Sequence, residues 1–278
     1  MITSDFTLFS RISNKIKRNY RFLVRARGKT IYHCCIQKSG SQWFKKIFND
    51  KIFWNEFKLA IHSPMENFII DNPKLLQRLN YLPQDALISP LYIRFNDFNN
   101  FDKPDNFRAF FVARDPRDLI ISNYFSLKYS HDPYHPYILK MRKHLNSISQ
   151  SDGITELIQS FTPGIYQTLN GWLTQKSENI RLIKFEDIFG VAQFKFFKEL
   201  LNHCGIGLND DDISMLLKKY SFKNISGRSQ GIEDKKKHYR KGVHGDWKHY
   251  FNDKQKKIFK ELSHDLLIIY GYEQNYDW

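Results

Sequence analysis

Residues 37–43 bring together a cation, two hydroxyls and a glycine in one short turn, reading Gln-Lys-Ser-Gly-Ser-Gln-Trp. The turn follows an apolar, strand-like run over Thr30–Ile36, and helical spacing begins at once after it, at Trp43 and Ile47. Backbone N–H groups and the positive end of the helix dipole then meet at one point, where Lys38 adds a full charge. This spacing predicts an anion cradle. The alternative is a capped helix after a buried strand. The turn is not the Gly-x-x-x-x-Gly-Lys-Ser/Thr loop of nucleotide triphosphatases, because Lys38 precedes the glycine.

A second candidate anion site follows the strand-like run over Arg108–Ala113. Residues 114–118 read Arg-Asp-Pro-Arg-Asp, and Ser122 comes about two turns into the helix that they begin. Arg114 is expected at the C-terminal end of a strand, where ligands bind in open α/β sheets. The alternative is a salt-bridge cluster among the charges of residues 114–118.

A third group of cations lies in residues 238–251. Arg240 and Lys241 precede Gly242, and Gly245 follows shortly after. Two cations beside backbone that glycine permits to turn sharply make a compact phosphate clamp. The alternatives are a solvated basic loop or a nucleic-acid patch with interleaved aromatic residues.

Strand-like runs alternate with longer segments of helical periodicity, which predicts a three-layer α/β fold: a parallel sheet with helices on both faces. The expected strands are Thr30–Ile36, Ala86–Ile93, Arg108–Ala113 and Ile180–Phe185. The expected helices are Trp43–Lys51, Leu119–Ser130, Gln193–His203, Asp210–Tyr220 and Lys254–Ile269. We expect a loop or lid over His131–Gly153, which is rich in His, Pro and polar residues, and a loop over the basic run Lys235–Lys241.

Composition indicates a globular protein with an affinity for anions. The 278 residues are 41% hydrophobic and 26% charged, with a formal net charge of +14. Three cysteines without metal or disulfide spacing favour a reducing compartment, so we expect a cytoplasmic protein with no bound metal. Cys34 and Cys35 should point to opposite faces of their strand.

The basic segment 1–28 is expected to be a separate arm or helix, followed by a single domain over 29–278. Its apolar residues recur at roughly helical spacing, so it either lies on an anionic membrane surface or packs on the domain as a helix or loose arm. It does not read as a signal peptide, and no apolar run is long enough to cross a bilayer.

Taken in order, the three motifs resemble those of the cytosolic-type sulfotransferase family, which uses 3′-phosphoadenosine 5′-phosphosulfate (PAPS) and releases adenosine 3′,5′-bisphosphate (PAP). Residues 37–43 are similar to its Pro-Lys-Ser-Gly-Thr-Thr-Trp loop, and residues 114–124 to its 3′-phosphate motif. Residues 240–248 are similar to its Arg-Lys-Gly-x-x-Gly-Asp-Trp-Lys motif. The resemblance spans about residues 30–265 and implies a P-loop nucleotide-hydrolase-like fold.

The resemblance also implies roles for single residues. Lys38 would contact the bridging oxygen of the phosphosulfate. The turn that cradles the 5′-phosphate would consist of Ser39, Gly40, Ser41 and Gln42. The adenine would lie against Trp43, Phe185 and Phe222, with Phe185 where the family often has Tyr. The 3′-phosphate would be held by Arg114, Ser122, Arg240, Lys241 and Gly242.

One departure concerns the catalytic base. The family's histidine lies in a Lys-Thr-His-Leu-Pro-type segment, which residues 93–98 match here with Asn96 in its place. Arg94 can replace the lysine of that segment as a contact for the sulfuryl oxygens. Asp97 is then the first candidate base and His62 the next. His131 and His135 are expected to line the acceptor pocket.

The expected reaction is in-line sulfuryl transfer from PAPS, without a metal, to a hydroxyl or amine of an unidentified glycan, lipid-linked or small-molecule acceptor. Two other functions stay open from the residues alone. One is a nucleotide phosphotransferase with an atypical loop. The other is a basic nucleic-acid-binding module, although the cations cluster at turns suited to one small anion, so no nucleic-acid partner is expected.

Overall fold

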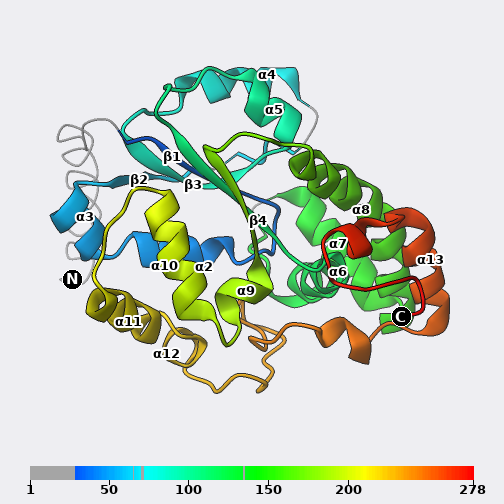
Figure 1. Ribbon diagram of the computed structural model, residues 1–278. Coiled ribbons are helices and arrows are strands. Elements are labelled where there is room, and N and C mark those ends of the chain that lie inside the picture. Colours follow the sequence, from blue (N-terminus) through cyan, green and yellow to red (C-terminus); the bar gives the residue numbers. More distant parts are fainter. Residues whose placement is uncertain (1–28, 65, 70–71, 134) are drawn as a thin grey trace, which may run out of the picture.

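A five-stranded parallel sheet lies between two layers of helices in the computed structural model, which describes residues 29–278 apart from 65, 70–71 and 134 (Figure 1). The strand order is β2-β3-β1-β4-β5. The strands are β1 (Ile31–Cys35), β2 (Ala60–His62), β3 (Ala86–Tyr92), β4 (Arg108–Ala113) and β5 (Ile180–Lys184). The predicted three-layer fold is confirmed, and β2, a three-residue strand at the edge of the sheet, is an addition to it.

The chain leaves the central strand in both directions, which places a crevice at the C-terminal ends of the strands. β1 pairs with β3 on one side (Ile31 with Leu87) and with β4 on the other (Ile31 with Arg108). Ligands bind outside the carboxyl ends of parallel strands at such a switch point. The turns that follow β1 and β4 carry two of the three predicted cationic motifs.

One face of the sheet is covered by the helices that follow β1 and β5. These are α2 (Ser41–Phe48), α3 (Lys51–Phe57), α9 (Phe185–Phe189), α10 (Gln193–His203), α11 (Asp210–Lys219) and α12 (Phe222–Ser226). Their apolar side chains pack with Ile31 and Cys35 of β1. Tyr32 and Cys34 belong to the core on the other face. The two adjacent cysteines therefore point to opposite faces, as predicted.

The other face carries a second group of helices. They are α5 (Phe95–Asn100), α6 (Pro116–Phe125), α7 (Pro136–Ser147), α8 (Gln150–Leu173), α13 (Asp253–Ser263) and α14 (Leu266–Ile269). Of these, α6, α7, α8 and α13 lie at the right of Figure 1 and α5 lies at the top. Short turns complete the chain: α4 (Pro73–Leu76), the 3₁₀ turns η1 (Gln77–Tyr81) and η3 (Asp246–His249), and the π turn η2 (Ser126–Ser130).

Several predicted boundaries were wrong for local reasons. The helix expected over Trp43–Lys51 is divided because Asp50 accepts from the N–H of Ile52 (3.1 Å) and begins α3. The helix expected over Lys254–Ile269 breaks at His264, whose φ is 47°. The loop expected over 131–153 contains α7 and the start of α8. Pro136 occupies the first turn of α7, where its missing N–H costs nothing.

No helix within the described ranges is long and apolar enough to span a bilayer. The basic segment 1–28, with its predicted arm and membrane contact, lies outside the described residues.

Candidate functional site

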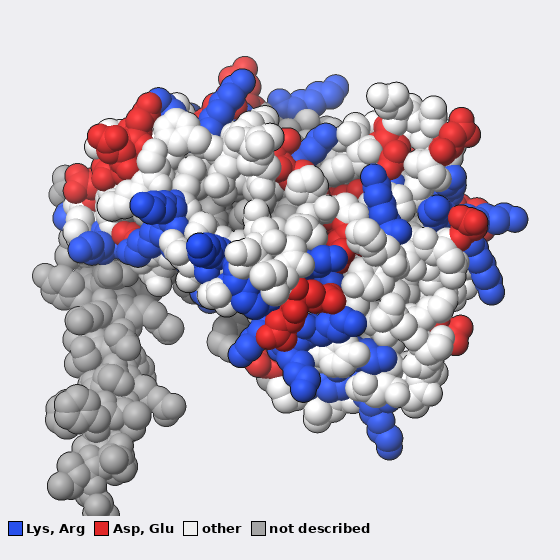
Figure 2. Space-filling model, turned by 90° about the horizontal axis from the view of Figure 1, so that it is seen from below, with Lys and Arg blue, Asp and Glu red and all other residues white. Residues whose placement is uncertain are grey.

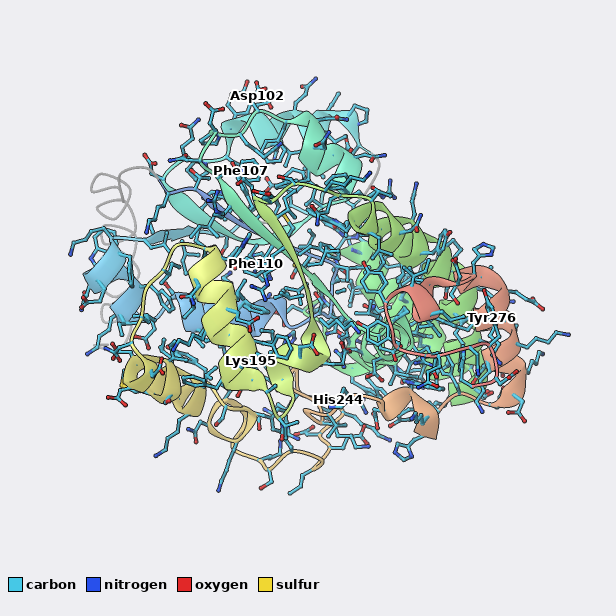
Figure 3. The ribbon with its side chains drawn as sticks, in the orientation of Figure 1. Asp102, Phe107, Phe110, Lys195, His244 and Tyr276 are labelled. Atoms are coloured by element: carbon cyan, nitrogen blue, oxygen red, sulfur yellow. The ribbon has the colours of Figure 1, made fainter. Side chains whose placement is uncertain are left out.

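A cavity of about 1430 Å³ opens at the C-terminal ends of the strands. It exceeds the ~300–1,000 Å³ typical of a site for one small ligand, so two ligands can share it. The loop that bears His244, another lining residue, runs below α9 in Figure 3. The predicted site residues that line the cavity are Lys38, Gly40, Ser41, Gln42, Trp43, Arg114, Ser122, Phe185, Phe222, Arg240, Lys241 and Gly242. Turns far apart in the sequence thus meet around one space.

The turn after β1 is shaped by two residues with positive φ, Lys38 at 70° and Gly40 at 82°. A Cβ on Gly40 would come within 2.9 Å of the Phe185 ring, so this position requires glycine. Gly40 is the N-cap of α2, whose first N–H groups have no carbonyl partner within the helix. The turn therefore presents donors to the cavity, as an anion cradle must.

Ser39 departs from its expected place in the cradle. Its hydroxyl is buried and donates to the carbonyl oxygen of Ile36 (2.6 Å), so the side chain tightens the turn from inside. It does not line the cavity. The Ser41 hydroxyl does, and it lies 2.9 Å from the Tyr92 hydroxyl at the end of β3.

Lys38 is half-buried among other cations. Burial, followed by the Arg114 and Arg240 guanidinium groups, lowers its pKa to about 8. Positive charges that depress one another's ionisation are stabilised by an anion placed between them. Six lining residues are Lys or Arg and three are Asp or Glu, so the cavity as a whole favours negative ligands.

Arg114 lies where β4 ends, mostly buried beside the first turn. Its Nη1 donates to the carbonyl oxygen of Lys38 (2.8 Å), and its guanidinium stacks 4.4 Å from the centre of the Phe185 ring. Within the described part of the chain, its buried Nε and the buried hydroxyl of Ser126 have no hydrogen-bond partner. Buried polar groups are nearly always paired, so these two orphaned groups suit a bound anion.

The third motif is joined to the second through a buried carboxylate. Asp118 of α6 accepts from the N–H groups of Gly245 (2.7 Å) and Trp247 (3.0 Å). Burial is the main reason why the pKa of Asp118 is raised. The loop over residues 238–251, called the late loop below, is thereby fixed beside Arg114, which lies 3.9 Å from the same carboxylate. Arg240, on the same loop, lines the cavity.

Arg240 and Lys241 face carboxylates of their own loop as well as the cavity. Both pair with Asp246, Lys241 at 2.6 Å, and Arg240 also pairs with Glu233. These pairs hold the cations in place. Figure 2 shows Lys and Arg gathered beside Asp and Glu on the face seen from below.

Three aromatic residues form a wall suited to a planar ring. Trp43 is buried, and its Nε1 donates to the carbonyl oxygen of Tyr220 (2.8 Å), which fixes the indole. Phe185 stacks on Phe189 with ring centres 4.3 Å apart. Phe222 packs so closely on Gly242 that a Cβ there would overlap its ring.

The structure does not bring Arg94, Asp97 or His62 to this cavity, because none of them lines it. The chain turns into α5 immediately after β3, and Arg94 is the N-cap of that helix. The carbonyl of Ile93 accepts from Trp172 Nε1 of α8 (3.1 Å), and Phe98 is fully buried. The segment therefore packs toward α8, and Tyr92 is its last residue on the cavity wall.

Several lining residues escaped the sequence reasoning. They are Lys46, Tyr92, Ser126, His238 and Tyr239. Ser126 lies one turn beyond Ser122, a spacing that could have indicated it. His131, which was expected at an acceptor pocket, does line the cavity, whereas His135 does not. The described residues contain no group of His, Cys, Asp or Glu that could hold a metal ion.

Comparison with known proteins agrees with this geometry. The sulfotransferase domain family matches residues 31–271. Mouse sulfotransferase 2A6 is 23% identical over 176 residues, which cover 58% of this chain and 56% of that protein. Human sulfotransferase 2A1 is 23% identical over 179 residues, covering 57% of each. The chain thus spans a little over half the length of these curated relatives.

Solved structures share the fold at low sequence identity. Mouse sulfotransferase SULT7A1 complexed with PAP has a TM-score of 0.61 at 18% identity and covers 90% of this chain and 88% of its own. Retinol dehydratase in a complex with retinol and PAP has a TM-score of 0.55 at 17% identity. The match covers 88% of this chain and 82% of the retinol dehydratase chain.

Proposed function

The chain belongs to the sulfotransferase domain family, and from this we propose that it transfers the sulfuryl group of PAPS to a hydroxyl or amine of an acceptor. The observation that carries the proposal is the meeting of Lys38, Arg114 and Arg240 around one cavity. Three cations from separate turns, beside an aromatic wall, fit an adenosine that carries phosphate at two positions. The mouse and retinol dehydratase structures with PAP support the same donor.

The donor-binding roles follow from position in the cavity. Arg114, with its orphaned Nε, and Ser122 would hold the 3′-phosphate with help from the Arg240–Gly242 backbone and side chains. The first-turn N–H groups of α2 would hold the 5′-phosphate. The adenine would lie against Trp43, Phe185 and Phe222.

Lys38 would act in the chemical step. PAPS supplies the activated sulfuryl group when it is bound. Lys38 stands at the helix N-terminus, where negative charge grows on the leaving phosphate oxygen. A single preorganised donor of this kind is worth ~10²–10³ in rate. The rest of the site positions donor and acceptor for in-line transfer.

The acceptor would occupy the part of the cavity that the donor leaves open. The volume admits a small molecule beside the donor. Retinol is the compound in the retinol dehydratase complex. A small-molecule acceptor is our proposal for this chain, with glycan and lipid acceptors to be included in a screen. A cytoplasmic location remains a prediction, with which the three free, buried cysteines agree.

Calorimetric titration with PAP tests the donor site. We expect saturable binding, weakened tenfold or more in Arg114→Ala, because a lost charge-assisted hydrogen bond costs about 1.5–3 kcal/mol. Arg181→Ala is the matched control, since this arginine pairs with Glu199 (2.5 Å) and does not line the cavity. Thermal unfolding establishes that both variants are folded.

Two results would contradict the donor assignment. Equal PAP affinities in wild type and in Arg114→Ala would mean that the second motif does not bind the donor. Tighter binding of magnesium–ATP than of PAP would favour a phosphotransferase instead. A screen with labelled PAPS and candidate acceptors then identifies the second substrate.

A further inference from the structure

His131 lines the cavity and is held in a defined position. It follows the π turn η2, and its N–H donates to the carbonyl oxygen of Ser126 (2.7 Å). Arg142 of α7 donates to the carbonyl oxygens of Leu127 (3.2 Å) and of His131 itself. Single π turns inside helices are frequent at functional sites. Here the π turn and Arg142 fix the backbone that presents the imidazole to the cavity.

The imidazole has a neighbour that selects its tautomer. Its Nδ1 lies 3.2 Å from the carbonyl oxygen of Asp132. A carbonyl can only accept, so the contact favours a proton on Nδ1. In that neutral tautomer Nε2 carries the lone pair. This is the form of histidine that can take a proton from a substrate.

The charged groups around His131 come from three other elements. Lys38 follows β1, Arg142 belongs to α7, and His238, itself near Lys46, lies on the late loop. Burial is the main cause that lowers the pKa of His131; Lys38 and Arg142 lower it further, while Asp132 raises it. Since the pKa of His131 is lowered from its ordinary value, its imidazole is neutral near pH 7 in the free protein, and the ammonium of Lys38 is one of the charges that lower this pKa.

We propose that His131 is the general base of the reaction, in place of the family's histidine, whose position holds Asn96. This inference rests on the proposed function. As the acceptor oxygen or nitrogen forms its bond to sulfur, its proton passes to Nε2 of His131. The bond from sulfur to the bridging oxygen breaks, and its electron pair stays on the 5′-phosphate beside Lys38. The proton then leaves His131 to water.

The first test compares acceptors that need a base with one that does not. Transfer from labelled PAPS is measured to cyclohexanol and to 4-nitrophenol at about pH 8.5, where the phenol is already ionised. His131→Gln should lose a hundredfold or more with cyclohexanol, within the ~10²–10⁴ range of general-base catalysis, and less than tenfold with 4-nitrophenol. If wild type uses neither probe, transfer to water must show the large loss. His144→Gln, an exposed histidine on α7, is the control and should match wild type.

Equal losses with both acceptors, or no loss with cyclohexanol or water, would overturn the role of His131. PAP affinity, measured by calorimetry on the same variant, should stay within about twofold of wild type. If PAP did not bind even to wild type, the proposed function would fail first. The two failures are therefore distinguishable.

A second readout needs no turnover. NMR titration of labelled histidines, with His131 assigned by its loss in His131→Gln, gives its pKa directly. PAP should raise that pKa, because a phosphate beside Lys38 cancels the charge that lowers it; Lys38→Met should raise it as well. No change in either case would place His131 away from the reacting centre and contradict the proposal.

Discussion

In the free protein the charged form of Lys38 is disfavoured by its surroundings. The pKa of its ammonium is lowered to about 8 by burial and by Arg114 and Arg240. In the unfolded chain the pKa of Lys38 is near 10.5. Between about pH 8 and 10.5 the unfolded chain therefore binds more protons than the folded chain. The free energy of unfolding therefore rises with pH through that window. Below the window, the charged form of Lys38 destabilises the folded protein. A bound anion removes this destabilisation.

PAP binding should consequently take up a proton. Above about pH 8 free Lys38 is largely neutral, and a phosphate beside it restores the charge. We expect uptake approaching one proton near pH 9, fading toward pH 7, and an affinity that falls up to tenfold per pH unit above 8. Calorimetry in buffers of different ionisation enthalpy measures the proton count.

Lys38→Met should abolish this uptake, whereas Lys46→Met, a second lysine of the cavity wall, should keep it. Proton release of the phosphate itself occurs at lower pH and persists in both variants. The same uptake in Lys38→Met and wild type would assign the titration to another group.

The late loop can pack closely on the Phe222 ring because it has a glycine, Gly242, at the point of contact. Gly242 has φ of 71°, and a Cβ there would overlap Phe222 of α12. The loop and α12 can therefore close on one another only without a side chain at this position. That contact sets the distance between the phosphate clamp and the proposed adenine wall.

Gly242→Ala should therefore weaken PAP binding tenfold or more by pushing Phe222 and the loop apart. Gly227→Ala is a matched control, since Gly227 has a similar φ of 73° but open space around it. Both variants carry the same backbone strain, of order 1–2 kcal/mol, and Gly242→Ala adds the cost of the contact with Phe222, so it should have the lower Tm of the two. Equal PAP affinities in the two variants would refute the steric argument.

The elements that could be predicted from sequence are those with a local signal. Buried parallel strands are continuous apolar runs, so β1, β3, β4 and β5 were recognisable. β2 has only three residues and depends on pairing with β3. α7 was mistaken for a loop, because its His, Pro and polar residues conceal a helix that packs against the π turn.

The same distinction applies to the candidate site. Turns that present donors are encoded within a few residues, so the three cationic motifs could be predicted to meet. Arg94 and Asp97 were placed by order along the chain alone, and neither of them lines the cavity. His238 comes from a loop whose position is set by Asp118, a tertiary contact that no local pattern reveals.

At the scale of the whole molecule, the site depends on packing among residues that do not line the cavity. Arg117 is buried beside the Arg114 turn, with Trp247 (3.8 Å) and Trp278 (4.4 Å) against its guanidinium. It pairs with Asp115 (2.7 Å) and Glu273 (2.5 Å). One arginine thus joins the start of α6, the late loop and the C-terminal segment. A cation between two indoles without full solvation gains about 2 kcal/mol or more.

Trp278→Ala should therefore unfold at a lower temperature than wild type. Losing one indole from Arg117 and from the edge contact with Trp247 (5.4 Å) is expected to cost about 2 kcal/mol, or about 4–8 °C in Tm for a domain of this size. Tyr276→Ala is the control, because Tyr276 is exposed in the same segment (labelled in Figure 3) and its removal should cost under ~0.5 kcal/mol. Differential scanning calorimetry compares the two variants. Equal Tm values would mean that Arg117 is held by its carboxylates alone, Asp115 and Glu273, and the Trp278 indole would then contribute nothing to the position of the Arg114 turn.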